Sequence, residues 1–582
     1  MKKKILIISQ LRPNFFKGEK TNILYFNEGC KPYKENFKNH LIVNYKFNAK
    51  KLIKDYKYLL NIYEIYLEII YKKLNQIHNV NFSIKHWRIL IGPWLFDFIS
   101  VVFDNLEKIQ FIDRNYSIKY VYVAKLHNSI FPNKDYLDYS YSVLTDEFNN
   151  QINLDLINYL KIFKVKFFFI KKQKFIKNSY ISIFINLLNN FFFKLLFYLN
   201  YIFLNLIKNI IKNYSVIHNT YFGKLTSFFF QIRLKQIPIF YKFNIKNNNI
   251  PNFELRNIKL KVSNKKFFKI LNHLIFKYMP ISYLENFNNY SLAVKEVNWP
   301  KKPKFIFSSN SFYFNDFFKF WIIEILKKNK PKLITGQHGG SFFISRFNWQ
   351  ELHQKQISDF VVTWGYKSNK FKQLFNYKVA NKRIKFNKQG KLLIVNYEIN
   401  RFSMIHNVNT NFLYSKYLER QLTFLHKLNS NIFANTIFRN HPSDYGLEVR
   451  DRITNIFPSI IFDKINDFKN SLNKKRICYI SLNSTTYLET FSLNFPTIIC
   501  FDEKVDLIRE EVKKDFILLK KAGIYYDDPK LAAEQINKIW NNVDKWWYSK
   551  KVQAAVNLFC SKHSRRAQNP VQELTDFFKK LH

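Results

Sequence analysis

The chain has 582 residues, with 93 Lys and Arg against 42 Asp and Glu, which gives a formal net charge of +51. Hydrophobic residues make up 47% and aromatic residues 19%. These fractions exclude a disordered protein, because disordered chains are poor in apolar and aromatic residues. The length indicates several domains of ordinary size. Four cysteines in so long a chain exclude a disulfide scaffold and are typical of a reducing compartment.

The positive charge is spread over the whole chain and comes mostly from Lys. Lys, Asn, Ile, Phe and Tyr are abundant together, a bias typical of AT-rich genomes. A nucleic-acid-binding surface is instead expected to be clustered and rich in Arg. We therefore expect no specific nucleic-acid partner, whereas a diffuse excess of Lys favours attraction to an anionic inner-membrane surface.

The chain begins with MKKKILIISQ, which resembles the start of a signal peptide. The apolar run covers only residues 5–8, Arg12 follows soon after, and no small-residue cleavage site is present. We therefore expect a first β-strand here, and a cytoplasmic protein.

Residues 180–210 are apolar and long enough to cross a bilayer. Lys194 stands at the middle of this segment, and asparagines that include Asn186, Asn189, Asn190, Asn200 and Asn205 interrupt it. A central Lys alone costs about 2.5–3.5 kcal/mol on insertion scales. We therefore expect a buried helical hairpin, or an amphipathic segment at the periphery of the inner membrane, rather than a membrane span.

Strand and helix patterns alternate along the chain. Residues 51–77 have the apolar spacing of a helix, and about 150–265 is mostly helical in pattern. The second half alternates short apolar strands with helices, as parallel α/β sheets do. Its predicted strands are 304–308, 331–335, 358–364, 391–396, 431–439, 460–462, 477–482 and 497–501. We predict an α/β fold with an N-terminal domain at 1–385, a helical insertion within it at about 150–265, and a C-terminal domain at 386–582.

Parallel α/β sheets bind ligands at the carboxyl ends of their strands, so we expect the site in the loops that follow the strands. Gly336, Gln337, His338, Gly339 and Gly340 follow one predicted strand directly. Three glycines in so short a loop, from 11 in the chain, indicate a sharp turn or a close backbone approach to a ligand. His338 is a candidate general base or phosphate contact. The alternative is a loop histidine without a role.

A second loop contains Arg439, His441 and Pro442 after the strand predicted at 431–439. Arg and His side chains at a strand end can both bind phosphate oxygens, and Pro442 fixes the turn. A lone His-Pro pair is weak evidence by itself.

A third loop places Ser484, Thr485 and Thr486 at the start of a predicted helix, where free N–H groups and the helix dipole attract an anion. Glu489 follows on that helix, in a position to accept hydrogen bonds from ribose hydroxyls. The alternative is an ordinary helix cap. In this order, the second and third loops predict a site for a nucleotide with a phosphate.

Several common sites are absent from the sequence. It contains no GxxxxGK[ST] or GxGxxG, which disfavours P-loop kinases and dinucleotide oxidoreductases. It contains no CxxC, HExxH or GxSxG. No Asp-x-Asp triplet occurs near a strand end, so we expect no obligatory metal and no cofactor.

Longer motifs resemble those of transferases encoded in bacterial surface-carbohydrate clusters, the O-antigen and capsule loci. The resemblance spans nearly the whole chain. It rests on NEGC at 27–30 with Tyr33, DYKYL at 55–59, HWRILIGPWL at 86–95, QHGG at 337–340, SD at 358–359 with TWG at 363–365, His441 with DYG at 444–446, NSTTYLE at 483–489, and IW at 539–540 with Asp544 and WW at 546–547.

That family is similar to GT-B-type transferases, a group that includes capsule enzymes using CMP-sugars and CDP-glycerol glycerophosphotransferases. The resemblance implies two Rossmann-like domains facing a central cleft, with the acceptor on the N-terminal domain and the nucleotide-sugar on the C-terminal domain. It also implies that His441, Pro442 and residues 484–486 hold a cytidine nucleotide, and that His338 works on the acceptor side. The family varies after its second-domain His, so the His-Pro pair is not a firm family mark.

We therefore expect a glycosyltransferase that moves a sugar from a nucleotide-activated donor, best CMP-linked or otherwise cytidine-linked, to a surface polysaccharide or a lipid-linked acceptor. Arg439 and Glu489 join the donor-binding residues. His338 deprotonates the acceptor, or a carboxylate, Glu28 or Glu285, acts as base or nucleophile.

Five further residues are expected to support the acceptor or the loop, namely Gly336, Gln337, Gly339, Gly340 and Arg88. Trp87, Arg88 and Trp94 either line an acceptor groove or belong to the core, with Arg88 paired to a carboxylate. The alternative function is a non-catalytic peripheral membrane scaffold of a polysaccharide assembly complex. This alternative leaves the glycine cluster and the two phosphate-type loops unexplained.

Overall fold

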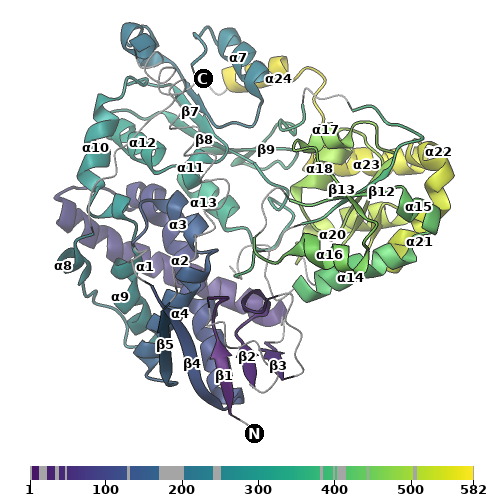
Figure 1. Ribbon diagram of the computed structural model, residues 1–582. Helices are drawn as coiled ribbons and strands as arrows, with labels where there is room; N and C mark the ends of the chain where they lie inside the picture. The colour runs from purple at the N-terminus through teal and green to yellow at the C-terminus, as the bar shows by residue number, and fades with distance from the viewer. Residues whose placement is uncertain are drawn as a thin grey trace.

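Three parallel β-sheets with helices around them form the protein (Figure 1). The computed structural model describes residues 3–11, 22–32, 39–45, 49–126, 132–169, 202–239, 241, 251–380, 384–397, 400–402, 414–441, 445–502 and 507–580. All strand pairs within the three sheets are parallel, so the carboxyl ends of the strands share one edge of each sheet.

The first sheet has the strand order β3-β2-β1-β4-β5. Its strands are β1 (Lys4–Ile7), β2 (Ile23–Tyr25), β3 (His40–Ile42), β4 (Ile118–Lys125) and β5 (Val165–Phe169). Two long helices, α1 (Ala49–His78) and α2 (Ile84–Asn115), lie between β3 and β4 in sequence. The helix predicted at 51–77 is confirmed by α1.

The second sheet has the order β10-β9-β8-β7-β6 and the third the order β13-β12-β11-β14-β15-β16. The second contains β6 (Val216–His218), β7 (Phe305–Ser308), β8 (Lys332–Gly336), β9 (Phe360–Thr363) and β10 (Phe371–Gln373). The third contains β11 (Leu392–Val395), β12 (Thr436–Arg439), β13 (Ile461–Phe462), β14 (Ile477–Ile480), β15 (Thr497–Cys500) and β16 (Tyr525–Tyr526). The third sheet reverses its winding between β11 and β14, and ligands of such sheets bind at this reversal.

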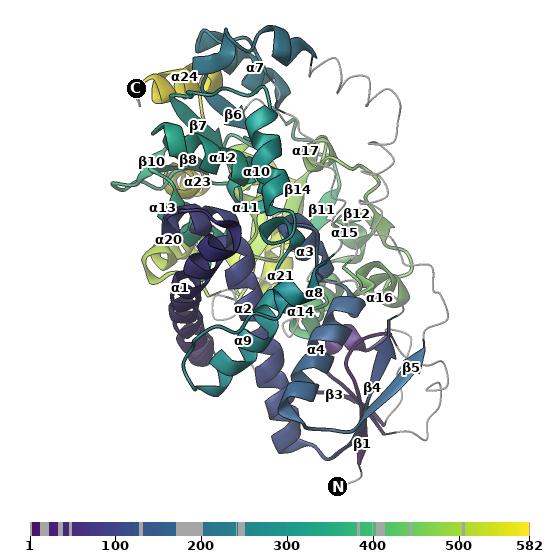
Figure 2. The same ribbon diagram turned by 90° about the vertical axis from the view of Figure 1, so that its left-hand side faces the viewer.

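The remaining helices cover the sheets and fill the space between them (Figures 1 and 2). They are α3 (Tyr136–Ser142), α4 (Asp146–Leu160), α7 (Lys224–Arg233), α8 (Phe253–Arg256), α9 (Lys266–Tyr278), α10 (Phe287–Glu296), α11 (Ser311–Phe314), α12 (Asp316–Lys328), α13 (Trp349–Ile357), α14 (Tyr414–Lys427), α15 (Ser430–Ala434), α16 (Val449–Ile456), α17 (Phe468–Leu472), α18 (Thr485–Ser492), α20 (Glu510–Lys521), α21 (Pro529–Ile539), α22 (Val543–Trp547), α23 (Lys550–His563) and α24 (Pro570–Lys579).

Helix α2 forms the centre of the largest hydrophobic core. Trp87 and Trp94 on this helix are fully buried, which confirms core packing rather than an exposed acceptor groove. Of the helices described, α2 alone has the length and apolar composition of a membrane span, and 94% of its most apolar stretch is buried inside the protein. A helix that is apolar all round is expected at such a position.

The prediction of an α/β fold with parallel sheets is confirmed, with differences in detail. Residues 430–434 form α15 and the strand predicted at 431–439 begins only at Thr436. The predicted helical insertion at about 150–265 also contains strands β5 and β6, which belong to two different sheets. Residue 385 lies between the second and third sheets. The grouping of the three sheets into two domains stays a prediction, and most of segment 180–210 lies outside the described residues.

Candidate functional site

Two of the loops singled out by the sequence meet in the structure. The loop that follows β8 contacts the start of α18, which follows β14, because the Gly340 N–H donates to Thr485 Oγ1 over 2.9 Å. A Cβ atom on Gly340 would lie 2.6 Å from the carbonyl oxygen of Ser484. Only glycine allows this approach. The carboxyl edges of the second and third sheets are therefore joined at these residues.

The other residues of the glycine loop hold its shape. Gln337 is buried, accepts from the Trp364 N–H over 2.9 Å and donates to the Gly339 carbonyl over 3.1 Å. A Cβ on Gly336 would lie 2.6 Å from the Tyr377 hydroxyl. The close approaches that the glycines allow are thus to protein groups, and the result is a fixed frame around His338.

His338 lies in this frame with a neutral imidazole. Burial lowers its pKa to about 4, the hydrogen bond with Gln350 opposes that effect, and the charge of Lys378 lowers the pKa further. Nε2 lies 2.7 Å from Gln350 Oε1, and the ring lies nearly parallel to Tyr221, at 16° and 6.4 Å between centroids. At pH 7 such an imidazole is unprotonated.

An ion pair lies beside the histidine. Lys378 Nζ is 2.9 Å from Glu489 Oε1 and lies over the ring of Tyr221, 5.4 Å from its centroid. Glu489 and Thr485 are four residues apart on α18 and so share one face of the helix. Glu489 is buried and forms an ion pair with Lys378. Its contact with the ribose of a nucleotide stays a prediction.

The sequence analysis missed Tyr221, Lys378 and Gln350. Lys378 is one of 93 basic residues, and nothing in its neighbourhood of the sequence distinguishes it. Tyr221 follows a strand of three residues, in a turn where Asn219, Tyr221 and Gly223 all have positive φ. Such backbone strain is common at functional sites and is visible only in the structure.

The start of α18 remains available to an anion. Ser484 is the N-cap residue, but its side chain makes no capping hydrogen bond, unlike Asn315 on α12 or Asn348 on α13. Ser484, Thr485 and Thr486 are half-buried rather than sealed in the core. Uncapped N–H groups in the first turn bind phosphate readily.

The loop after β12 has a different character. Arg439 donates to the Asp463 carboxylate over 2.6 Å and to the carbonyl oxygens of Ile465 and Asn466. Burial would raise the pKa of Asp463, but the hydrogen bonds from Ser471 and Arg439 outweigh it and lower the pKa. The guanidinium of Arg439 thus anchors the segment after β13. This structural role explains the residue without any contact to a nucleotide-sugar.

His441 is exposed and its ring lies 5.4 Å from that of Tyr445, at 27°. Its predicted contact with the nucleotide stays a prediction. Pro442, the other half of the His-Pro pair, lies outside the described residues.

Glu28 lies at a separate junction, between the first and third sheets. Burial raises its pKa, although the charges of Arg452 and Lys31 oppose the shift. Next to it, a Cβ on Gly29 would lie 2.2 Å from Cγ of Arg401, which forms an ion pair with Asp146. The described residues include no contact between Glu28 and His338, so the two predicted catalytic residues are not brought together.

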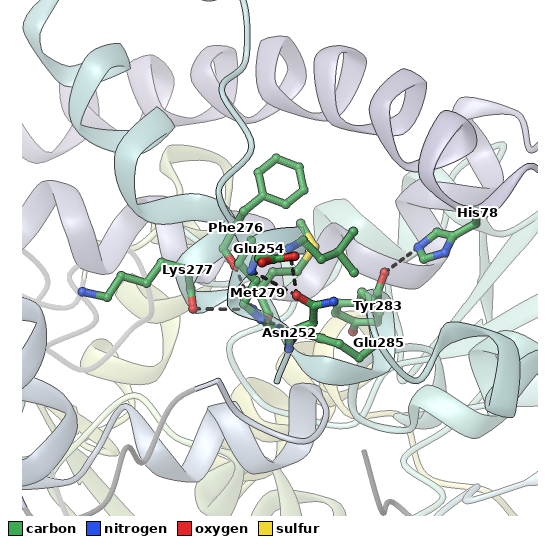
Figure 3. Close-up of polar contacts among 10 residues, drawn as sticks. His78, Asn252, Glu254, Phe276, Lys277, Met279, Tyr283 and Glu285 are labelled. Atoms are coloured by element: carbon green, nitrogen blue, oxygen red, sulfur yellow. Dashed lines mark hydrogen bonds and ion pairs between the residues drawn. The ribbon is translucent and has the colours of Figure 1, made fainter. Parts of the chain in front are cut away.

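Glu285 is excluded as a catalytic carboxylate. Both of its oxygens accept hydrogen bonds from Arg256, each at a distance of 2.7 Å. Oε1 also accepts from the Asn252 N–H at 3.0 Å. Figure 3 shows Glu285 beside Asn252 and Met279 in the helical layer. The carboxylate is about 5% exposed, and it ties Asn252 and Arg256 to the segment that carries Glu285.

Arg88 is likewise a structural residue. Its guanidinium donates to both oxygens of Glu64, each at a distance of 2.7 Å, and to Gln356 Oε1 at 3.2 Å. Of the two alternatives, the structure therefore has Arg88 paired with a carboxylate. The predicted role of Arg88 in supporting an acceptor stays a prediction.

The described residues contain no group of three or more His, Cys, Asp or Glu side chains that could hold a metal ion. The expected independence from metal stays a prediction.

A family model of the LIC12162 family transferases matches residues 6–578 of the chain. The protein belongs to the LIC12162 family of transferases. It is therefore placed among enzymes rather than among non-catalytic scaffolds.

Solved structures similar to this transferase include the S. aureus MnaA–UDP co-structure, with a TM-score of 0.36, 10% identity, and coverage of 64% of this chain and 96% of that one. The spinosyn rhamnosyltransferase SpnG has a TM-score of 0.26 and 8% identity, with coverage of 51% of this chain and 79% of that one. No curated protein sequence matches the chain.

The first prediction concerns the glycines of the transferase. Gly340→Ala is expected to destabilise the contact between the second and third sheets by about 1–3 kcal/mol, because the added methyl overlaps backbone atoms of Ser484 and Thr485. Gly339→Ala is the matched control, since its Cβ would meet nothing nearer than Thr485 Oγ1 at 3.7 Å. Thermal unfolding midpoints measure the difference, and equal midpoints would contradict the assigned contact.

A second prediction concerns the imidazole of His338. Lys378→Met is expected to raise the pKa of His338, because the variant removes a nearby positive charge and leaves Glu489 unpaired. The pKa is measured by NMR titration of protein with ¹³C-labelled histidine, with His338→Gln to assign the signal. Lys372→Met, on β10, is the control and should leave this pKa unchanged. The same titration curve in Lys378→Met and in wild type would refute the electrostatic coupling.

Proposed function

We propose that this transferase is a glycosyltransferase. It moves a sugar from a nucleotide-activated donor, CMP-linked or otherwise cytidine-linked, to a surface polysaccharide or a lipid-linked acceptor. The observation that carries the proposal is the contact between Gly340 and Thr485, which sets a neutral histidine beside an uncapped helix start.

The phosphate of the donor binds at the start of α18. The hydroxyls of Ser484 and Thr486 and the first N–H groups of the helix donate to its oxygens, and Lys378 lies close by on the same side as Glu489. Negative charge grows on this phosphate as the bond to the sugar breaks. Donors that are already in place stabilise such charge without reorganising.

His338 acts as the base towards the acceptor. The hydroxyl of the acceptor loses its proton to the imidazole, its oxygen forms the bond to the anomeric carbon, and the nucleotide phosphate leaves with the electron pair of the old bond. The resting pKa of about 4 is low for a base. A bound phosphate raises this pKa, because its negative charge favours the imidazolium.

The other expected features belong to the same proposal. His441 and Pro442 contact the nucleotide from the loop after β12. Glu28 lies at the junction of the first and third sheets and is the second candidate base. The reaction needs no obligatory metal or cofactor. The enzyme is cytoplasmic, held at the periphery of the inner membrane, and has no specific nucleic-acid partner.

A third prediction tests donor binding. CMP and CDP are expected to raise the thermal unfolding midpoint of the protein, since a ligand that binds only the folded state stabilises it. Ser484→Ala should weaken this binding about tenfold, through the loss of one hydrogen bond to a charged group. The free variant should unfold as the wild type does, because the Ser484 side chain makes no capping bond.

Ser561→Ala is the matched control, an exposed serine on α23 whose hydroxyl donates to the Leu558 carbonyl. It should leave the protection by CMP intact. Folded protein that no nucleotide stabilises would overturn the proposal of a nucleotide-sugar donor.

A fourth prediction separates the two candidate bases. With a donor and acceptor identified by screening, His338→Ala should lower kcat by about 10²–10⁴-fold and leave protection by CMP in place. Glu28→Gln should change kcat by no more than a few fold, because Glu28 lies at a different junction. The opposite ranking of the two variants would move the base from His338 to Glu28.

A further inference from the structure

Helix α7 turns an apolar stripe to solvent. Leu225 is 74% exposed and Phe229 is 51% exposed. Phe228 and Ile232 complete the stripe at spacings of three and four residues, which places all four on one side of the helix. The opposite side is buried, where the ring of Phe230 lies 5.3 Å from that of Phe578. This arrangement is unusual for a helix that faces water.

Residues 202–210 add a second apolar stripe at the same end of the molecule (Figures 1 and 2). Phe203, Leu206 and Ile210 are exposed there, Leu206 by 76% and Ile210 by 60%. We call the exposed side chains of this stripe and of α7 together the α7 face. Its members are Phe203, Leu206, Ile210, Leu225, Phe228, Phe229 and Ile232.

The segment of the chain that carries the α7 face has charge of one sign, although Glu573 and Asp576 lie on α24, which packs against α7. Residues 156–253 contain no Asp or Glu and fifteen Lys and Arg. Among these, Lys208, Lys212, Lys224 and Lys235 are exposed within or beside the two stripes. No other stretch of the chain without Asp or Glu is as long.

We propose that the α7 face binds an anionic membrane surface. Apolar side chains enter the boundary between headgroups and acyl chains, while the lysines around them meet the phosphates of anionic lipids. A second copy of this chain is a poor occupant, because the lysines within and beside the two stripes would repel those of the other copy.

The site described above lies on the other side of α7. Asn219, Tyr221, Ser227 and Asn310 contribute to a hollow of about 270 Å³ against the inner side and amino end of this helix. Tyr221 in turn stacks on His338. On the proposed transferase function, which this step assumes, the enzyme takes its acceptor from the membrane on which α7 rests.

The test is binding of the full chain to lipid vesicles. Protein is sedimented with phosphatidylglycerol–phosphatidylcholine vesicles and with pure phosphatidylcholine vesicles. Binding is expected to the first, to weaken with added salt, and to be far weaker to the second. Leu225→Ser with Phe229→Ser should lower the partition coefficient at least about tenfold, since each loses most of a buried apolar side chain.

The control carries Ile517→Ser and Leu558→Ser, two residues exposed by 50% and 45% on α20 and α23, and should bind as the wild type does. Circular dichroism shows whether each variant is folded. Equal loss in both variants, or no vesicle binding by wild type, would overturn the proposal, as would a dimer that only the α7 variant abolishes. Vesicle binding is independent of protection by CMP, so this failure is distinct from failure of the donor proposal.

Discussion

The close approach of Gly340 to Thr485 is the constraint on which the site depends. It fixes how far His338, on the second sheet, lies from the start of α18, on the third. Neighbouring contacts reinforce it, since Asn483 donates to Ser345 over 3.1 Å and Arg509 pairs with Glu351 at 2.9 Å. A site shared by two sheets works only when this separation is held to a fraction of an ångström. The glycine therefore fixes the geometry of the proposed site even though it has no side chain.

The third sheet is joined to its neighbours through the two strands that flank its reversal of winding. The segment after β11 carries Arg401, which pairs with Asp146 of the first sheet's region. The segment after β14 carries Thr485, which contacts the second sheet. Helix α24 returns to the second sheet, where Phe578 packs on Phe305 and Phe307. Contacts on both sides of the reversal thus fix the third sheet relative to the other two.

The sequence predicted the parts of this arrangement that depend on rare residues. Glycine is scarce in the chain, so the cluster at 336–340 stood out, and the helix start at Ser484 had a recognisable cap pattern. Lys378 could not be found, because one lysine among so many carries no signal. The pairing of Arg439 was equally hidden, and the pairing of Arg88 was only one of two alternatives, since only the positions of Asp463 and Glu64 show that the guanidinium groups are already paired. The three-sheet arrangement was obscured by the apolar composition at 150–265, which gives helices and short strands the same appearance.

The same argument applies to charge. A net charge of +51 says little about binding partners when lysines are spread over the whole chain by a compositional bias. It does not show where on the surface a partner would bind. The location comes from where acids are missing. Between Asp155 and Glu254 the chain has no carboxylate side chain to balance its lysines, and that stretch includes α7 with its apolar stripe exposed. Compositional drift explains many lysines but does not remove acids from one region or set leucine and phenylalanine on the outside of a helix. The missing acids and the exposed apolar stripe coincide on α7, and together they are the basis for proposing that this face meets a membrane.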